Sequence, residues 1–192
     1  MHAGKRSFLG DLIGRLLRHS VPVDGVILTT ALLMSSATPL QAHAIDFDSR
    51  LREIGVELPS ASPPAANYVK AIRVGNLLFL SGHAAVSGFR GKLGKDMTTE
   101  EGYQAARSTA ISAIATLKQE LGDLNKVKRI VKVMGMVNST PEYTEQHLVV
   151  NGFSDLVVAV FGEKGKHARS AVGMGALPFN FAVEIDLIVE VE

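Results

Sequence analysis

Arg169 and Glu184 are the two side chains whose types and positions best suit chemistry on a small molecule. Arg169 opens a predicted strand directly before an apolar stretch, where a guanidinium needs either a partner or a ligand. One interpretation is an ion pair with Glu184, Asp186 or Glu190 on a neighbouring strand. The other is a bidentate clamp for the carboxylate of a substrate. The residue pattern alone favours the ion pair.

Other kinds of catalytic site find little support in the sequence. Its 192 residues include no cysteine, which excludes a disulfide scaffold, a thiolate metal site and a cysteine nucleophile. His83, His147 and His167 lie far apart and lack the paired spacing of zinc ligands. The motifs of phosphate-binding loops, dinucleotide-binding folds, zinc proteases and serine hydrolases do not occur. We therefore expect no metal ion in the site.

The charge balance argues against a nucleic-acid partner. Lys and Arg number 20 against 19 Asp and Glu, and only 6% of the residues are aromatic. The one basic cluster is formed by Lys126, Lys128, Arg129 and Lys132. We interpret it as the solvated end of a strand, because the domain around it is net acidic and offers few aromatic side chains.

The elements that must position these residues can be followed along the chain. We expect helices over residues 46–54, 98–121 and 140–161, and strands over 69–74, 77–82, 127–137, 169–175 and 181–191. Thr98 and Glu101 form a capping box at the start of the second helix, and Thr140-Pro141 is taken as the start of the third. The β-β-α-β-α-β-β order after the first helix predicts an α+β fold, with both long helices on one face of a single sheet.

The N-terminal part differs from the rest in composition. We divide the chain into a leader (1–44), a short helix with a proline-rich linker (45–66) and a folded domain (67–192). The leader has three interpretations: a segment before a true start at Met34 or an unstructured leader, a signal peptide cleaved after Ala44, or a membrane anchor. We favour the first, and hence a cytoplasmic protein without a stable membrane anchor; cleavage after Ala44 would instead imply export.

Three segments near the C-terminus resemble the C-terminal signature of the YjgF/RidA family in order and spacing. They are Ala168-Arg169-Ser170-Ala171-Val172, Leu177-Pro178 and Val183-Glu184-Ile185-Asp186. The resemblance also includes Tyr68, the Gly75-Asn76 turn, Ser81-Gly82 and Asn151. It spans roughly residues 67–192 and is closest to the longer bacterial members, which carry an extra N-terminal helix.

The resemblance implies a chorismate-mutase-like fold, a mixed sheet with two helices on one face, assembled as a homotrimer with clefts between neighbours. It also implies hydrolytic deamination of reactive enamines and imines of amino-acid metabolism, without a cofactor. In that activity Arg169 would hold the substrate carboxylate and Glu184 would position or deprotonate the attacking water. Tyr68, Ser81, Asn151 and Ala171 would line the cleft.

Several positions depart from the family pattern and leave other functions open. Ala171 stands where the family often has Cys, His83 where it often has Gln, and Phe179-Asn180-Phe181 replaces a more charged turn. A trimer that binds small carboxylates without catalysis is therefore the alternative function. RNA cleavage, another activity ascribed to the family, is less well supported, since no basic groove is evident. Met134, Met136 and Ile130 are expected to add apolar area to the open sheet face, which a three-fold ring would bury.

Overall fold

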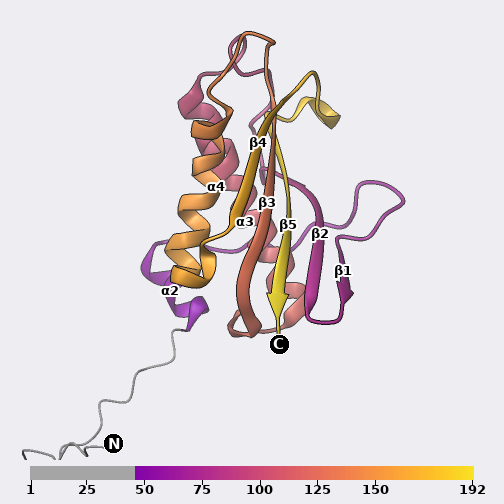
Figure 1. Ribbon diagram of the computed structural model, residues 1–192, viewed down its shortest axis with the longest axis vertical. Helices are drawn as coiled ribbons and strands as arrows, with labels where there is room; N and C mark the ends of the chain where they lie inside the picture. Colours follow the sequence, from indigo (N-terminus) through magenta and orange to yellow (C-terminus); the bar gives the residue numbers. More distant parts are fainter. Residues whose placement is uncertain (1–45) are drawn as a thin grey trace, which may run out of the picture. The chain divides into compact units, whose positions relative to one another are not determined.

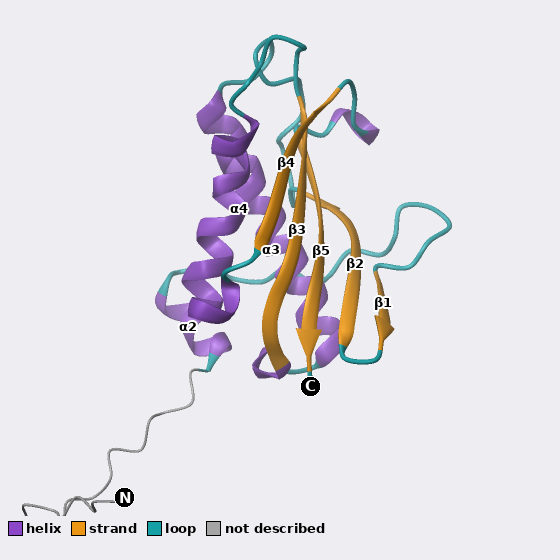
Figure 2. Cartoon of the chain, in the orientation of Figure 1, coloured by secondary structure: helices purple, strands orange, loops and turns teal. Residues whose placement is uncertain are grey.

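A five-stranded mixed sheet with two long helices on one face forms the body of the protein (Figure 1). The structure is a computed structural model that describes residues 46–192, so the predicted leader and its Ala44 cleavage site lie outside the described residues. The elements are α2 (Phe47–Glu53), β1 (Ala71–Val74), β2 (Leu77–Ala84), α3 (Thr99–Leu121), β3 (Val127–Asn138), α4 (Gln146–Phe161), β4 (Ala168–Met174) and β5 (Val183–Val191). The predicted α+β class, with both long helices on one face, is confirmed (Figure 2).

The sheet has the strand order β1-β2-β5-β3-β4, with β5 at its centre. β1 and β2 form an antiparallel hairpin whose turn places Gly75 at a φ of 59°, a conformation that glycine adopts without strain. β3 and β4 are the parallel pair, and α4 forms the crossover between them. This topology places β3 between β4, which carries Arg169, and β5, which carries Glu184.

Alternation along the strands separates a helix-facing side of the sheet from an open side. On β5, Val183, Ile185 and Leu187 are buried, while Glu184 and Asp186 between them are half-buried on the opposite face. The expectation that Ile130 lies on the open face is wrong. The register between β3 and β5 shifts between Ile130 and Lys132, and Ile130 is buried in the core.

The two long helices pack closely against each other and confirm most of their predicted boundaries. Thr98 and Glu101 form the reciprocal capping box of α3, and Gly122 ends that helix. A Cβ at Gly152 of α4 would lie 2.0 Å from the backbone oxygen of Tyr103, so the helices need a glycine at this contact. The predicted start of α4 at Thr140 is wrong: the chain first forms a turn, and the helix begins at Gln146.

The strand boundaries also differ at their ends. β1 begins at Ala71 rather than at residue 69, and β2 continues to Ala84. β5 begins at Val183 rather than at residue 181, because Pro178–Asn180 forms a short 3-10 turn before it. These shifts place residues 178–181 in a loop at the end of the sheet, next to the cavity described below.

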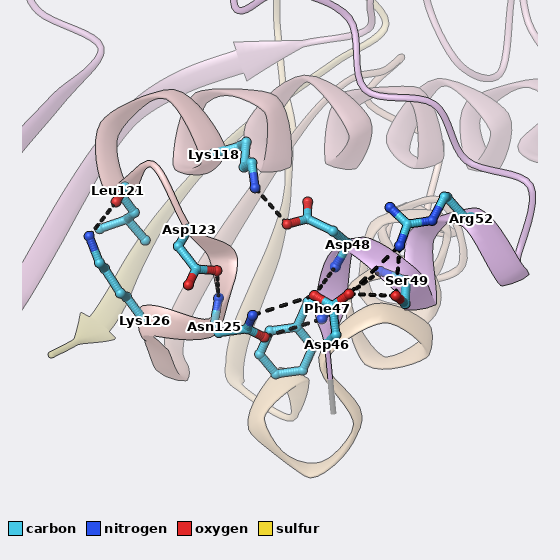
Figure 3. Close-up of polar contacts among 10 residues, drawn as sticks. All are labelled: Asp46, Phe47, Asp48, Ser49, Arg52, Lys118, Leu121, Asp123, Asn125 and Lys126. Carbon is cyan, nitrogen blue, oxygen red and sulfur yellow. Dashed lines mark hydrogen bonds and ion pairs between the residues drawn. The ribbon is translucent and has the colours of Figure 1, made fainter. Parts of the chain in front are cut away.

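The short helix α2 is fixed to the body by polar and aromatic contacts (Figure 3). Asp48 Oδ2 lies 2.5 Å from Lys118 Nζ of α3, and the backbone N–H of Phe47 donates to Asn125 Oδ1 at 3.2 Å. The Phe47 ring packs edge-on against Phe161 at 4.9 Å between centroids. These contacts fix α2 against the body, so the N-terminal end of the segment 59–66 that follows it is also held in place. Within residues 46–192, no helix is long and apolar enough to cross a bilayer.

Candidate functional site

Arg169 is held by α4 on the helix-facing side of the sheet. Its Nη1 donates to Asn151 Oδ1 at 2.9 Å and to Ser154 Oγ at 3.0 Å, and its Nη2 donates to the carbonyl oxygen of His147 at 3.2 Å. We call Arg169, Asn151, Ser154 and His147 the arginine cluster. The guanidinium has five N–H donors, and within residues 46–192 Nε and one hydrogen of Nη2 keep no partner. The group is oriented and can still bind a carboxylate.

The arginine cluster continues into His167, which the sequence analysis considered only as a zinc ligand. His167 Nδ1 lies 2.6 Å from the carbonyl oxygen of Gly165, which can only accept, so Nδ1 carries the proton. Nε2 then accepts from Ser154 Oγ at 3.0 Å, which leaves the serine lone pairs for Arg169. Burial lowers the pKa of His167 and favours this neutral form. His167 and Ser154 thus hold Arg169 in place.

The ion-pair interpretation of Arg169 is wrong for the single chain. β4 lies next to β3 and not next to β5, so no acidic side chain of β5 faces Arg169. Among the ion pairs of residues 46–192, none includes Arg169. Ala171 lies two residues further along β4 on the same face and packs against the core.

Glu184, on the open face of the sheet, lines a separate cavity of about 890 Å³ whose lining also includes Ser112 and Ala115 of α3. We call this cavity the glutamate pocket. Four segments form its walls. They are residues 59–66, the loop that follows β2, part of α3 and the turn at residues 178–181. Its polar side chains are Tyr68, Lys70, Ser81, Glu184 and serines of the walls. Small and apolar residues form the remainder.

Burial raises the pKa of the Glu184 carboxyl group above its usual value, and the nearby Asp186 carboxylate raises it further. The Lys70 ammonium group acts in the opposite direction. Glu184 also lies directly over Gly82, where a Cβ would come within 2.0 Å of Glu184 Oε1. A half-buried carboxyl group with a raised pKa in a cavity suits a general base that takes a proton from water.

Tyr68 and Ser81 line the glutamate pocket, as the resemblance implied they would line a cleft. Ser81 Oγ donates to the carbonyl oxygen of Val69 at 2.6 Å, and the Tyr68 hydroxyl accepts from the backbone N–H of Ala65 at 3.3 Å. The six predicted site residues therefore form two groups. Arg169, Asn151 and Ala171 share one face of the sheet, and Glu184, Tyr68 and Ser81 share the glutamate pocket on the other.

Sequence reasoning missed three contributors to these groups. Ser154 and His167 carry no motif of their own, and only the packing of α4 on β4 brings them to Arg169. Lys70 follows Tyr68 by two residues and lines the same cavity, so its spacing from Tyr68 was the available signal. Within the described part of the chain, no three His, Asp or Glu side chains gather as metal ligands would.

Comparison with known proteins identifies the family. A family model described as "YjgF/chorismate_mutase-like, putative endoribonuclease" matches residues 48–191. The chain belongs to this family. The matched region begins within α2 and includes both the arginine cluster and the glutamate pocket. The recognition of the YjgF/RidA family from the sequence is therefore confirmed.

Individual YjgF relatives match along nearly their whole length. Protein TCP17 of Trypanosoma cruzi is 46% identical over 147 residues, covering 74% of this chain and 92% of that protein. The crystal structure of a protein of unknown function from Agrobacterium tumefaciens has a TM-score of 0.72 at 45% identity and covers 76% of this chain and 92% of its own. A protein of Dermatophagoides farinae named 2-iminobutanoate/2-iminopropanoate deaminase is 25% identical over 142 residues, covering 71% of this chain and 95% of that protein.

His83, the residue in place of the family's frequent Gln, has a structural role behind Ser81. It is 1% exposed; its Nδ1 lies 2.6 Å from the carbonyl oxygen of Ser81, and its Nε2 lies 2.8 Å from Thr116 Oγ1. The carbonyl can only accept, so the buried ring is neutral with its proton on Nδ1. Burial lowers the pKa of His83 from 6.5 to about 4.

This shift predicts a loss of stability in mild acid. Between pH 6.5 and about 4 the unfolded chain binds a proton at residue 83 that the folded chain excludes, so the free energy of unfolding falls as the pH falls. The full loss is about 3 kcal/mol. Urea unfolding of the His83→Gln variant should show a smaller decline over this range, because a glutamine amide can contact Ser81 and Thr116 without titrating. His147→Gln, at an exposed position, is the control, and an unchanged decline in His83→Gln would contradict the assignment.

Proposed function

We propose that this protein hydrolyses reactive imines, and the enamines that convert to them, formed from amino acids, at a site shared between two copies of the chain. One observation carries the proposal. The oriented guanidinium of Arg169 and the pKa-raised carboxyl group of Glu184 lie on opposite faces of one sheet. Each chain thus offers two complementary halves of a site for an imino acid, and a second copy can supply the missing half.

The chemistry needs only positioning and one base. Arg169 holds the carboxylate of the imino acid, and Glu184 accepts a proton from a water molecule. The water oxygen bonds to the imine carbon while the π electrons of the C=N bond move to nitrogen, which takes up a proton. In the collapse of this tetrahedral adduct the hydroxyl proton moves to the nitrogen by way of Glu184, the oxygen forms the C=O bond and the carbon–nitrogen bond breaks, so that ammonia leaves and a 2-oxo acid remains. The deaminase name of the mite relative supports this reaction class, and its 25% identity leaves the substrate to experiment.

The open face of the sheet supports an assembly of several copies. Phe79 and Met134 are exposed there, and Glu184 and Asp186 are half-buried beside them. Helices cover the other face, so a second copy is the available means of burying this apolar area. We propose the homotrimer that the family resemblance implies, with one site at each of its interfaces.

The proposed activity is tested with an amino-acid oxidase that generates imines in the presence of semicarbazide. The protein should divert imine from the trapped semicarbazone to free 2-oxo acid, in proportion to its concentration. No diversion with any amino acid would exclude the imine hydrolase. Binding of 2-oxo acids without diversion would favour the non-catalytic carboxylate-binding protein.

The shared site is tested by mixing two inactive variants. Arg169→Ala and Glu184→Gln chains, co-expressed with different tags and isolated as mixed trimers, should regain about a third of the wild-type activity, because one of the three interfaces in each mixed trimer combines an intact Arg169 with an intact Glu184. Separately expressed variants combined without subunit exchange are the control. A site confined to one chain would regain nothing in the mixture.

A further inference from the structure

Phe179, in the lining of the glutamate pocket, adopts a backbone conformation that its side chain disfavours. Its φ is 55°, in the left-handed region where residues other than glycine are uncommon. The residue is 66% exposed and contributes to the lining of the pocket. A large apolar side chain thus faces solvent at a position where the backbone is strained, and a glycine would adopt this backbone conformation without strain.

The neighbouring side chains hold the Phe179 loop in this conformation. Arg90 donates from Nη1 to the carbonyl oxygen of Phe179, and its guanidinium lies over the Phe181 ring at 4.4 Å from the centroid. The rings of Phe179 and Phe181 meet edge to face at 6.0 Å between centroids. The pair forms a fixed apolar platform that borders the cavity around Glu184.

A second part of the pocket wall is the segment 59–66, which we call the proline strap. It contains Pro59, Pro63 and Pro64, whose φ angles are fixed by their rings. The strap links α2, which is anchored by Lys118 and Asn125, to β1 (Figures 1 and 3). Because its ends are tied and its prolines limit its motion, the wall does not collapse, and a ligand need not order it.

We propose that the Phe179–Phe181 platform and the proline strap form a side-chain subsite that selects carboxylate substrates with large apolar side chains, aromatic or branched, over those with a methyl or ethyl group. This rests on the proposed function, since Glu184 in the lining of the same pocket provides the reacting end. A cavity of about 890 Å³ with small and apolar walls leaves a methyl group mostly surrounded by water. A phenyl or isobutyl group would contact both walls and lose far more apolar surface to them.

Binding of product analogues tests the subsite without relying on catalysis. Calorimetry with the intact protein should give a dissociation constant for phenylpyruvate about tenfold or more below that for pyruvate, with 4-methyl-2-oxopentanoate closer to phenylpyruvate. The same order is expected for imines of phenylalanine, leucine and alanine in the semicarbazide assay. Equal or stronger binding of pyruvate would overturn the subsite.

Two substitutions at residue 179 separate a subsite from a structural role. Phe179→Ala should weaken phenylpyruvate binding about three- to tenfold and leave pyruvate binding unchanged. Phe179→Gly should lose the same selectivity, yet keep or raise the melting temperature, because glycine adopts the positive φ freely. Ile72→Ala, which removes another exposed apolar side chain outside the pocket, is the matched control and should change neither ligand.

The outcomes distinguish this inference from the proposed function. Absence of imine hydrolysis with selective phenylpyruvate binding would overturn the hydrolase and retain the subsite. Hydrolysis that does not distinguish imines by side-chain size would retain the hydrolase and overturn the subsite. The same holds for a selectivity that does not change when Phe179 is replaced. A change of oligomeric state in Phe179→Ala, seen by light scattering, with ligand preference unchanged would assign Phe179 to an interface between copies and overturn the subsite as well.

Discussion

Replacing Arg169 with alanine is expected to reduce kcat/KM for imine hydrolysis about 100- to 1,000-fold, which is the loss of two charge-assisted hydrogen bonds to a carboxylate. The expectation depends on geometry. Asn151, Ser154 and the carbonyl oxygen of His147 take three of the guanidinium hydrogens and fix the orientation of the rest. Steady-state rates in the semicarbazide assay, together with calorimetry on a 2-oxo acid, measure the loss.

The same side chain also ties β4 to α4, so controls must separate activity from stability. Arg169→Ala removes three hydrogen bonds between these elements and should lower the melting temperature. Arg169→Lys keeps the charge without the planar fork, and we expect it to bind the carboxylate more weakly than wild type. Arg129→Ala, at an exposed position on β3, should match wild type in activity. Wild-type kcat/KM in a folded Arg169→Ala protein would remove Arg169 from the site.

The architecture could be predicted from the sequence because its signals are local. The capping box of Thr98 and Glu101, the glycine at 122 and the alternation along β5 each fix one boundary or one face by short-range physics. The prediction that α4 starts at Thr140 was wrong because it, too, relied on local signals alone. Pro141 is compatible with a first helical turn, but nothing near it reveals that Tyr143 closes a turn on Thr140 and delays the helix to Gln146.

Local sequence signals could not predict the long-range features of the site. The shift in register at Ile130 is a property of the pairing between β3 and β5, and no pattern on β3 alone announces it. Likewise, the residues of the family signature were recognised together, yet their distribution over two faces depends on the register of β4 and β5 against β3, in which Arg169 pairs with Val133 and Glu184 with Met136. The proline strap was predicted as a linker, and its place in the wall of the cavity follows from the position of α2.

Glu184→Gln is expected to lower kcat about 100- to 10,000-fold, the range for removal of a general base, while leaving the dissociation constant of a 2-oxo acid nearly unchanged. Glutamine keeps the size of the side chain over Gly82 but cannot accept a proton from water. The proposed activity of the wild-type protein should fall as the pH falls through the pKa of Glu184. Burial and the Asp186 carboxylate raise that pKa. The acid limb of the pH–activity profile should therefore lie at a higher pH than the usual pKa of a glutamate.

The neighbouring carboxylate provides the matched control and a test of the cause. Asp186 lies on the same strand and face as Glu184, and its charge raises the pKa of Glu184. The Asp186→Asn variant should therefore remain active, with the acid limb of its pH profile moved to lower pH, because the ionised form of Glu184 no longer meets a like charge. Two results would assign the titration to another group. One is an acid limb at the wild-type pH in Asp186→Asn, and the other is an acid limb that persists in the residual activity of Glu184→Gln.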